Sequence, residues 1–466
     1  MSADINSVSK EDPRRHIASV SKVLSLPKII ELSQKYSPAQ TTETIQEILG
    51  ELRHSVENGE SPDISLSRIV ERVSEKLRNI EHDRLQAVVN ATGILLHTGL
   101  GRAVLPQKAV DAMARLNRCC NLQIDLETGL RGKRDFMSSN LIRKLTGAEM
   151  SVLTNNNAAA TLLILAALAP GKEVIISRGQ LIEIGGSFRL PDCIMQSGAK
   201  MVEVGTTNKT HLRDYEQAIN EHTALILKVN PSNYRITGFT QDVSIQELVS
   251  LKNKYPITVV DDLGCGALID LSAFGLPKEP MVQDSIAAGA DVVCFSGDKL
   301  IGGPQCGIIA GSKEVVSKIK KHPLSRMLRV CKLTSLALEQ TLRLFTDPTT
   351  LIQNNPTLRM LTVPLPELKK KAERIVASIK VSGTDLKFGI VPSESETGGG
   401  SLPGCLIPSY AISLQSTRYS TNQLSKKLRD FEPPIIARIT RNEVLLDIRT
   451  LMEGDEETIK VCLENL

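Results

Sequence analysis

An asparagine-rich segment could bind an anion at the start of a helix. Residues 154–160 read Thr-Asn-Asn-Asn-Ala-Ala-Ala and follow a short apolar run. Unbonded backbone N–H groups at a helix start attract anions, asparagine is a favoured cap, and alanines allow a ligand to approach closely. Asn156, Asn157 and Ala158 are therefore candidate phosphate-binding residues. Taken alone, however, the segment is better explained as an ordinary capped and buried helix.

A pair of carboxylates follows the apolar run 257–260. Asp261 and Asp262 precede Leu263-Gly264, which puts a carboxylate at the carboxyl edge of a predicted parallel sheet, where ligands bind in such folds. One of the two acids is a candidate ligand of a cofactor, and a metal site or a plain strand end would explain the pair equally well. The glycines at 264 and 266 do not form a dinucleotide-binding motif, because they follow the acids and Ile269 replaces the third glycine.

A lysine lies in the turn-rich segment 296–305, directly after the apolar run 292–295. Lysines in apolar, crowded sites lose their proton easily and form Schiff bases with carbonyl groups. Lys299 is therefore a candidate catalytic residue together with its neighbour Asp298, and Ser296 could add a phosphate contact. The alternative for any single lysine is an exposed loop position.

The order of these segments indicates one kind of chemistry. A helix start that binds anions, an acid at a strand end and a lysine behind a later strand are typical of pyridoxal phosphate enzymes with the aspartate-aminotransferase fold. This cofactor requires a site for its phosphate, a carboxylate that keeps its ring nitrogen protonated, and a Schiff-base lysine. We therefore expect pyridoxal 5'-phosphate. We expect no metal, because the sequence has no HExxH motif and no cysteine–histidine cluster at zinc spacing.

The elements that must position these residues alternate between strand and helix from residue 85 onward. Such alternation predicts an α/β fold with a mixed, mostly parallel sheet. The predicted strands are 150–153, 173–176, 201–204, 224–229, 257–260, 291–295 and 307–310, then 411–414, 435–439 and 444–448 after a basic helical stretch at 313–343. Residues 1–85 show only helical spacing of apolar residues. We expect three domains, namely a helical domain at 1–85, a cofactor-binding large domain at 86–330 and an α+β small domain at 331–466.

Composition limits the partners. The 466 residues include 56 basic and 52 acidic side chains, no Trp, 6 Tyr and 8 Phe, which excludes an aromatic stacking platform for single-stranded nucleic acid and argues against a DNA-binding protein. The nine cysteines are scattered and odd in number, which is typical of a reducing compartment. No signal peptide or membrane-length apolar run is evident. We expect a cytoplasmic protein without a membrane partner.

Longer stretches match the motifs of one known family. They cover the chain from about residue 85 to its end and lie at 90–102, 125–129, 131–134, 155–160, 177–189, 204–208, 232–235, 262–264, 296–305, 322–326, 356–359 and 398–403. In these stretches the chain closely resembles the bacterial L-seryl-tRNA(Sec) selenium transferases, or selenocysteine synthases. Residues 1–85 resemble the family more weakly.

The resemblance implies a fold, a reaction and partners. It implies an aspartate-aminotransferase-type fold, a homodecamer built as a ring of dimers, and a pyridoxal-dependent replacement of the serine hydroxyl of seryl-tRNA(Sec) by selenium from selenophosphate. By resemblance, Lys299 is the cofactor lysine and the base at the α-carbon, and Asp262 is the partner of the ring nitrogen. Arg102, Arg326 and Arg329 match arginines that hold the selenium donor, which suits guanidinium groups. The helical N-terminus matches the tRNA(Sec)-binding domain.

Some positions depart from the family pattern, and other functions stay open. The departures are Gly99 in place of Asn, Asn230-Pro231 in place of His-Thr, Cys265 in place of Ser, and Cys331 in place of Asp. One alternative is a pyridoxal-dependent lyase acting on a free amino acid or amino sugar acid. Another is a non-catalytic tRNA-binding scaffold. The helical N-terminus argues against the first, and the intact lysine, acid and helix start argue against the second.

The charge of residues 1–85 is the main tension in this interpretation. They carry 12 basic and 14 acidic side chains, which is a poor electrostatic match for RNA. A folded tRNA can, however, be recognised by its shape and backbone. We therefore expect tRNA contacts to be spread over several subunits, with the basic stretch 313–329 sharing them.

Overall fold

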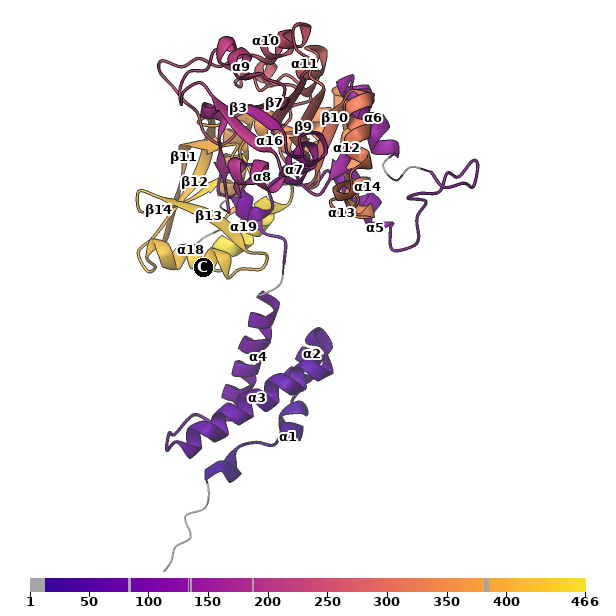
Figure 1. The fold of residues 1–466 in the computed structure, drawn as a ribbon. Helices are drawn as coiled ribbons and strands as arrows, with labels where there is room; N and C mark the ends of the chain where they lie inside the picture. The colour runs from indigo at the N-terminus through magenta and orange to yellow at the C-terminus, as the bar shows by residue number, and fades with distance from the viewer. Residues whose placement is uncertain (1–12, 83–84, 133, 135, 187, 381–384) are drawn as a thin grey trace, which may run out of the picture. The chain divides into compact units, whose positions relative to one another are not determined.

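The computed structural model describes residues 13–82, 85–132, 134, 136–186, 188–380 and 385–466, which form two compact units, Met1–Val88 and Val89–Leu466 (Figure 1). Residues 1–12, 83 and 84 of the expected helical domain lie outside the described residues. So do residues 133 and 187 of the family-like stretches. Among the residues described, no helix combines the length and apolarity that a bilayer span requires.

The first unit is a small helical bundle. Its core consists of the apolar residues that recur at helical spacing, including the fully buried Ile45, Leu49 and Ile69. Ser65 caps the last helix, because its hydroxyl accepts from the backbone N–H of Arg68 at 3.4 Å, and Asp63 fixes the preceding turn by accepting from the backbone N–H of Ser65 at 2.9 Å. The expected helical N-terminal region is confirmed. Its elements are η1 (Pro13–His16), α1 (Val20–Leu24), α2 (Pro27–Tyr36), α3 (Pro38–Glu57) and α4 (Leu66–His82).

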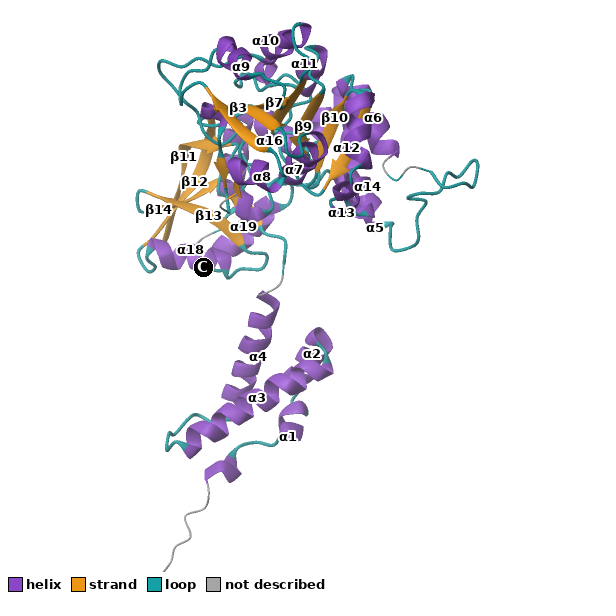
Figure 2. Ribbon diagram, in the orientation of Figure 1, coloured by secondary structure: helices purple, strands orange, loops and turns teal. Residues whose placement is uncertain are grey.

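A seven-stranded sheet forms the centre of the second unit, and helices cover both of its faces (Figure 2). The strands, in spatial order, are β2 (Met150–Thr154), β10 (Gly307–Gly311), β9 (Val292–Ser296), β8 (Thr258–Gly264), β7 (Thr223–Val229), β3 (Glu173–Ser177) and β6 (Lys200–Val204). All neighbours pair in parallel except β10, which is antiparallel to both β2 and β9. The expected mixed, mostly parallel sheet is confirmed. Its strands lie within two residues of the predicted runs except at the end of β8, which continues through both carboxylates to Gly264.

The helices around this sheet follow the strands in sequence. They are α5 (Gln107–Ala114), α6 (Phe136–Thr146), α7 (Asn157–Leu168), α8 (Leu190–Gln196), α9 (Leu212–Ala218), α10 (Ile245–Ser250), α11 (Val282–Ala287), α12 (Lys313–Lys321), α13 (Pro323–Met327), α14 (Lys332–Leu344), α15 (Pro348–Asn354) and α16 (Pro356–Thr362). The predicted helical stretch 313–343 is divided into α12, α13 and α14, since Pro323 cannot continue the helix before it. Short elements fill the connections, namely η2 (Thr98–Leu100), η3 (Arg178–Gln180), β4 (Glu183–Ile184), β5 (Phe188–Arg189), η4 (Leu251–Asn253) and η5 (Leu271–Phe274).

A second, five-stranded sheet lies toward the C-terminus. Its order is β1 (Val89–Ala91), β13 (Ile435–Thr440), β14 (Glu443–Asp447), β12 (Leu406–Ser416) and β11 (Leu386–Glu396), and it packs with α17 (Leu365–Ser378), α18 (Thr421–Arg429) and α19 (Asp455–Glu464). β1 pairs in parallel with β13, so the sheet joins the two ends of the second unit. Sequence patterns missed β1 and β11. The proposed boundary near residue 330 stays a prediction.

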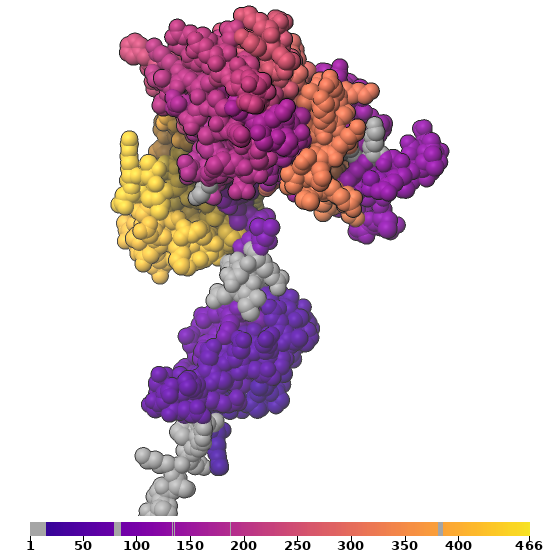
Figure 3. Space-filling view, in the orientation of Figure 1, coloured from indigo at the N-terminus to yellow at the C-terminus, as the bar shows by residue number. Residues whose placement is uncertain are grey.

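The connection between α5 and α6 projects from the body of the second unit (Figure 3). Asp125 fixes its turn by accepting from the backbone N–H groups of Glu127 and Thr128, at 3.0 and 2.9 Å. Leu126 and Leu130 are 77% and 70% exposed. Such a cluster of exposed apolar side chains is typical of a surface that another chain covers.

Candidate active site

One cavity of about 250 Å³ brings most of the predicted site residues together. It lies where the carboxyl ends of β8 and β9 meet the start of α7. The predicted residues that line it are Arg102, Asn156, Asn157, Ala158, Asp262, Ser296, Asp298 and Lys299. Residues far apart in sequence therefore converge at one edge of the sheet, as expected for this class of fold.

The start of α7 forms one wall of the cavity. Asn156 caps the helix, because its Oδ1 accepts from the backbone N–H of Ala159 at 2.8 Å. The first N–H groups of a helix have no partner within the helix, so those at the start of α7 are available to an anion. Ser296 is buried at the end of β9 and lines the same cavity, where its hydroxyl can add one more donor.

The carboxylate of Asp262 is held by three donors. Its Oδ1 accepts from Asn157 Nδ2 at 2.7 Å and from the backbone N–H of Gly264 at 3.0 Å, and its Oδ2 accepts from the Thr161 hydroxyl at 2.8 Å. Sequence reasoning missed Thr161. Its position one helical turn after Asn157 could have revealed it, since residues four apart share a face of the helix.

Asp261 points to the opposite face of the sheet, because side chains alternate along a strand. Its Oδ2 accepts from the Ser285 hydroxyl at 2.6 Å, and its Oδ1 is buried without a partner among the residues described. Burial raises the pKa of Asp261 to about 6. The structure thus separates the two acids of the motif, and Asp262 alone lines the cavity.

Replacing Asp261 by asparagine should remove a pH-dependent loss of stability. Because its pKa is raised from 3.8 to about 6, Asp261 favours the folded state most at low pH, and this contribution is lost as pH rises toward 6. As pH rises from 4 to 7, the free energy of unfolding of Asp261→Asn should therefore increase relative to that of wild type by up to about 3 kcal/mol. Urea unfolding at each pH measures this difference.

Asp270→Asn is the matched control for this prediction. Asp270 is exposed, and hydrogen bonds from Ser272 lower its pKa, so its substitution should shift the pH dependence in the opposite direction. Parallel pH profiles for Asp261→Asn and wild type would contradict the prediction.

Lys299 lies in the tight connection between β9 and β10 and is 7% exposed. Burial, with a smaller effect of Arg102, lowers the pKa of its amine, although Cys265, Asp298 and Asp262 act in the other direction. Its Nζ donates to the carbonyl of Gly400 at 3.4 Å. Gly400 has a φ of 76°, and a Cβ there would lie 3.2 Å from Nζ, so glycine keeps space beside the amine.

Arg102 reaches the cavity from the segment that follows β1. Its Nη1 donates to Asp298 Oδ2 at 2.9 Å, directly beside the lysine. Its backbone has a φ of 61°, and its N–H donates to the carbonyl of His97 at 3.0 Å. The Nε of Arg102 is buried without a partner in the described part of the chain. Asp298 thus holds Nη1 of the guanidinium group, and Nε is left as a free donor.

The side chains around the cavity fit pyridoxal phosphate. The start of α7 and Ser296 offer donors to a phosphate, Asp262 offers a carboxylate to a protonated ring nitrogen, and Lys299 offers an amine to a carbonyl group. Two further polar atoms, Asn157 Oδ1 and Ser232 Oγ, are buried without partners among the described residues. Unpartnered buried polar atoms are rare in folded proteins, and a bound ligand would satisfy them.

The structure does not bring Arg326 and Arg329 into this cavity. Arg326 lies on α13, Arg329 follows that helix, and both side chains are exposed. The carbonyl of Leu328 accepts from the backbone N–H of Asn155 at 2.8 Å, so the end of α13 lies beside the residues that precede α7. Two of the three arginines expected at the donor site are thus outside the cavity of their own chain.

Of the departures from the family pattern, only Asn230 lines the cavity. Cys265 is fully buried behind it, and its Sγ donates to Glu279 Oε2 at 3.2 Å. Cys331 is exposed at the start of α14, and hydrogen bonds with Thr334 lower the pKa of its thiol. Gly99 is exposed in η2. Two of them lie close to the site, since the backbone N–H of Asn230 donates to the carbonyl of Asp262 at 2.8 Å and Cys265 raises the pKa of Lys299 against the lowering effect of burial.

Comparison with known proteins gives consistent results. A family model described as "SelA: L-seryl-tRNA selenium transferase" matches residues 88–452. The chain is 45% identical to an L-seryl-tRNA(Sec) selenium transferase of Caldanaerobacter subterraneus subsp. tengcongensis, over 98% of this chain and 99% of that one. It is 43% identical to that of Carboxydothermus hydrogenoformans, over 97% of both chains.

A solved structure extends the comparison to the fold. A D-glucosaminate-6-phosphate ammonia-lyase aligns with a TM-score of 0.56 and 22% identity, over 83% of this chain and 96% of that one. At this identity the likeness concerns the fold alone. The expected aspartate-aminotransferase-like α/β fold is confirmed.

Proposed function

The chain belongs to the L-seryl-tRNA selenium transferase family, and from this premise we propose how its residues divide the work of the reaction. It is a pyridoxal phosphate enzyme that converts seryl-tRNA(Sec) to selenocysteinyl-tRNA(Sec). The selenium donor that we propose is selenophosphate. The observation that best supports the assignment is the single cavity in which Lys299, Asp262, the start of α7 and Arg102 converge.

The cofactor is held by residues from three elements. Asn156, Asn157, Ala158 and Ser296 would bind its phosphate, and Asp262 would pair with its ring nitrogen. When bound, pyridoxal phosphate supplies an electron sink for the negative charge that develops at the α-carbon of the substrate serine. Thr161 and Asn157 orient the Asp262 carboxylate, because both donate to it.

Lys299 moves the proton at the α-carbon. Burial lowers the pKa of its amine, so a larger fraction is neutral near pH 7 than for an exposed lysine, and the neutral amine can accept a proton. The Gly400 carbonyl accepts a hydrogen bond from the amine, and the charge of Asp298 acts on it electrostatically.

Arg102 binds the selenium donor. Its Nε is a buried free donor, and a guanidinium group suits a phosphate-like anion. Arg326 and Arg329 are exposed and lie outside the cavity of their own chain, so a role at the donor site requires them to reach the cavity of a second copy. The exposed Leu126 and Leu130 on the projecting connection support such an assembly, for which we propose the ring of dimers.

A conversion assay tests the proposed function. With selenophosphate present, the enzyme should form selenocysteinyl-tRNA(Sec) from seryl-tRNA(Sec), and free serine should give no comparable product. Turnover of free serine with no conversion of the charged tRNA would support a lyase instead.

The helical N-terminal unit should carry part of the tRNA affinity. Removing residues 1–85 should weaken binding of tRNA(Sec) by about tenfold or more. It should leave the cofactor in place, because every residue that lines the Lys299 cavity belongs to the second unit. Filter binding measures the first quantity and cofactor absorbance the second. Unchanged tRNA affinity would remove the unit from the binding surface.

A further inference from the structure

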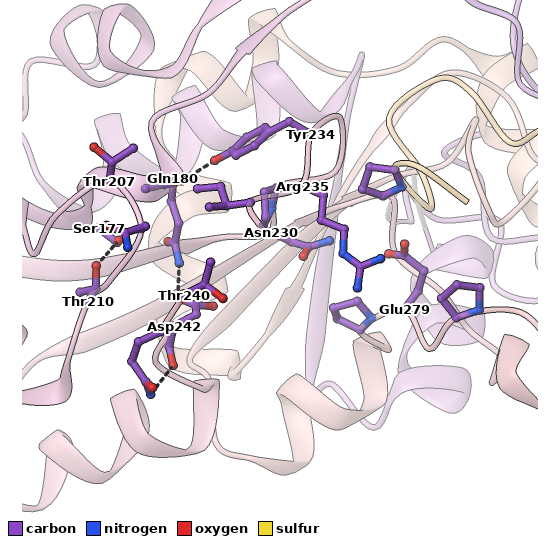
Figure 4. Close-up of a pocket in the computed structure, with 18 of the residues that line it drawn as sticks. Ser177, Gln180, Thr207, Thr210, Asn230, Tyr234, Arg235, Thr240, Asp242 and Glu279 are labelled. Atoms are coloured by element: carbon purple, nitrogen blue, oxygen red, sulfur yellow. Dashed lines mark hydrogen bonds between the residues drawn. The ribbon is translucent and has the colours of Figure 1, made fainter. Parts of the chain in front are cut away.

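A second cavity, of about 410 Å³, adjoins the Lys299 cavity (Figure 4). It is formed by the segments after β3 and β7 and by two loops, residues 277–280 and 402–405. Asn230 lines both cavities. The residue after it, Pro231, lines the second cavity, whereas Ser232 lines the first. The two cavities therefore meet along residues 230–232.

The segment 400–402 also shows that the second cavity lies close to Lys299. The carbonyl of Gly400 accepts from Lys299 Nζ, and Leu402, two residues further on, lines the second cavity. Two residues of extended chain span at most about 7 Å. The second cavity therefore begins a short distance from the Lys299 amine.

The inner part of this cavity is polar and held rigidly. Gln180 donates to Asp242 Oδ1 at 3.0 Å and accepts from the backbone N–H of Val229 at 2.9 Å. The Tyr234 hydroxyl donates to the carbonyl of Gly179, which holds the ring at the cavity wall. Dashed lines in Figure 4 mark the bonds of Gln180 to Asp242 and of Tyr234 to Gly179. Amide and hydroxyl groups beside a fixed aromatic ring suit a nucleoside, which has hydrogen-bonding edges and a flat face.

The charges limit what else could bind. Arg235 is exposed, extends toward Glu279 in Figure 4, and forms no hydrogen bond or ion pair among the described residues. The two carboxylates that line the cavity are engaged, since Asp242 pairs with Lys228 at 2.7 Å and Glu279 accepts from the backbone N–H of Leu402 at 2.9 Å. A small, multiply charged anion such as the selenium donor would meet two carboxylates here. A single phosphodiester carries one negative charge, which Arg235 alone can balance.

We propose that the second cavity binds the 3'-terminal nucleotide of the tRNA substrate, with Arg235 on its phosphodiester. This assignment rests on the proposed function. In any aminoacyl-tRNA the amino acid is an ester of the terminal ribose, so a seryl group at Lys299 must have its ribose next to it. The shared boundary at residues 230–232 and the short step from Gly400 to Leu402 put the second cavity next to that position.

A binding cycle with the full-length holoenzyme tests the assignment. Affinity is measured for uncharged tRNA(Sec) and for the same tRNA shortened by its terminal nucleotide, with wild type, Arg235→Ala and Arg235→Lys. Wild type should lose about tenfold in affinity for the shortened tRNA, as expected for one charge-assisted contact. Arg235→Ala should bind both tRNAs equally, and Arg235→Lys should retain part of the difference.

Arg213→Ala is the matched control. Arg213 is an exposed arginine of α9 that lines none of the cavities described, and it should keep the full wild-type difference. In the conversion assay, Arg235→Ala should raise KM for seryl-tRNA(Sec) about tenfold and change kcat little.

Two results would overturn the assignment. The first is equal binding of both tRNAs by wild type, and the second is an undiminished difference in Arg235→Ala. In either case, continued conversion of seryl-tRNA(Sec) by the wild-type enzyme would leave the proposed function intact. Failure of wild type to convert the charged tRNA would instead count against the proposed function itself.

Discussion

Replacing Lys299 by alanine is expected to lower the conversion of seryl-tRNA(Sec) by about 10²–10⁴-fold. The amine is buried, has a lowered pKa and donates to the Gly400 carbonyl, and among the residues that line the cavity no other primary amine could serve as both cofactor attachment and base. Arg102 is the other cationic side chain in the cavity, and a guanidinium group does not lose its proton near neutral pH.

The attachment site can be mapped directly. Reduction of the wild-type holoenzyme with borohydride, followed by peptide mass analysis, should place the pyridoxyl group on the peptide that contains Lys299. The exposed Lys426 of α18 provides the control, since Lys426→Ala should keep both the label and the activity. A label on any other lysine of wild type would disprove the assignment.

Replacing Arg102 by alanine should impair use of the selenium donor far more than attachment of the cofactor. Loss of one or two charge-assisted hydrogen bonds to an anion should raise KM for selenophosphate by about 10- to 100-fold. Removing the guanidinium group also removes an effect that lowers the pKa of Lys299, so the pKa should rise. Cofactor attachment should then require a higher pH, without being lost.

Two measurements separate these effects. Steady-state kinetics with varied selenophosphate gives the first, and a pH titration of cofactor absorbance gives the second. Arg102→Lys should restore part of the pH profile, because it restores a positive charge, but little donor binding, because lysine lacks the planar fork. Equal loss of donor use and cofactor binding in Arg102→Ala would indicate a folding defect.

Much of this site could be predicted from local sequence. The start of α7, the acids in β8 and the turn at Lys299 each follow an apolar, β-branched run, and such runs fix both the strand and the edge at which it ends. Local pattern alone could not show which of the two acids faces the cofactor. The structure shows that Asp262 lines the cavity, where Asn157 and Thr161 donate to it, whereas Asp261 points to the opposite face of the sheet.

Other features depend on partners distant in sequence. β11 contains Gly389 and Pro392, which weaken any strand signal, and it becomes a strand because all eleven of its residues pair with β12. β1 has only three residues and owes its conformation to β13. Sequence could not predict that Arg326 and Arg329 are exposed outside the cavity either. A motif match does not tell which chain of an assembly uses a residue.

The pairing of β1 with β13 has a consequence for biosynthesis. Val89 pairs with Ile435, so the ribosome must translate almost the whole second unit before β1 finds its neighbour. The following segment depends equally on late-synthesised chain, because the N–H groups of Leu95 and Leu96 donate to the carbonyls of Glu396 and Thr397. Arg102 comes six residues after Leu96. A nascent chain that already contains Lys299 therefore lacks the support that brings Arg102 to Asp298, and the donor site can be completed only after the last strands emerge.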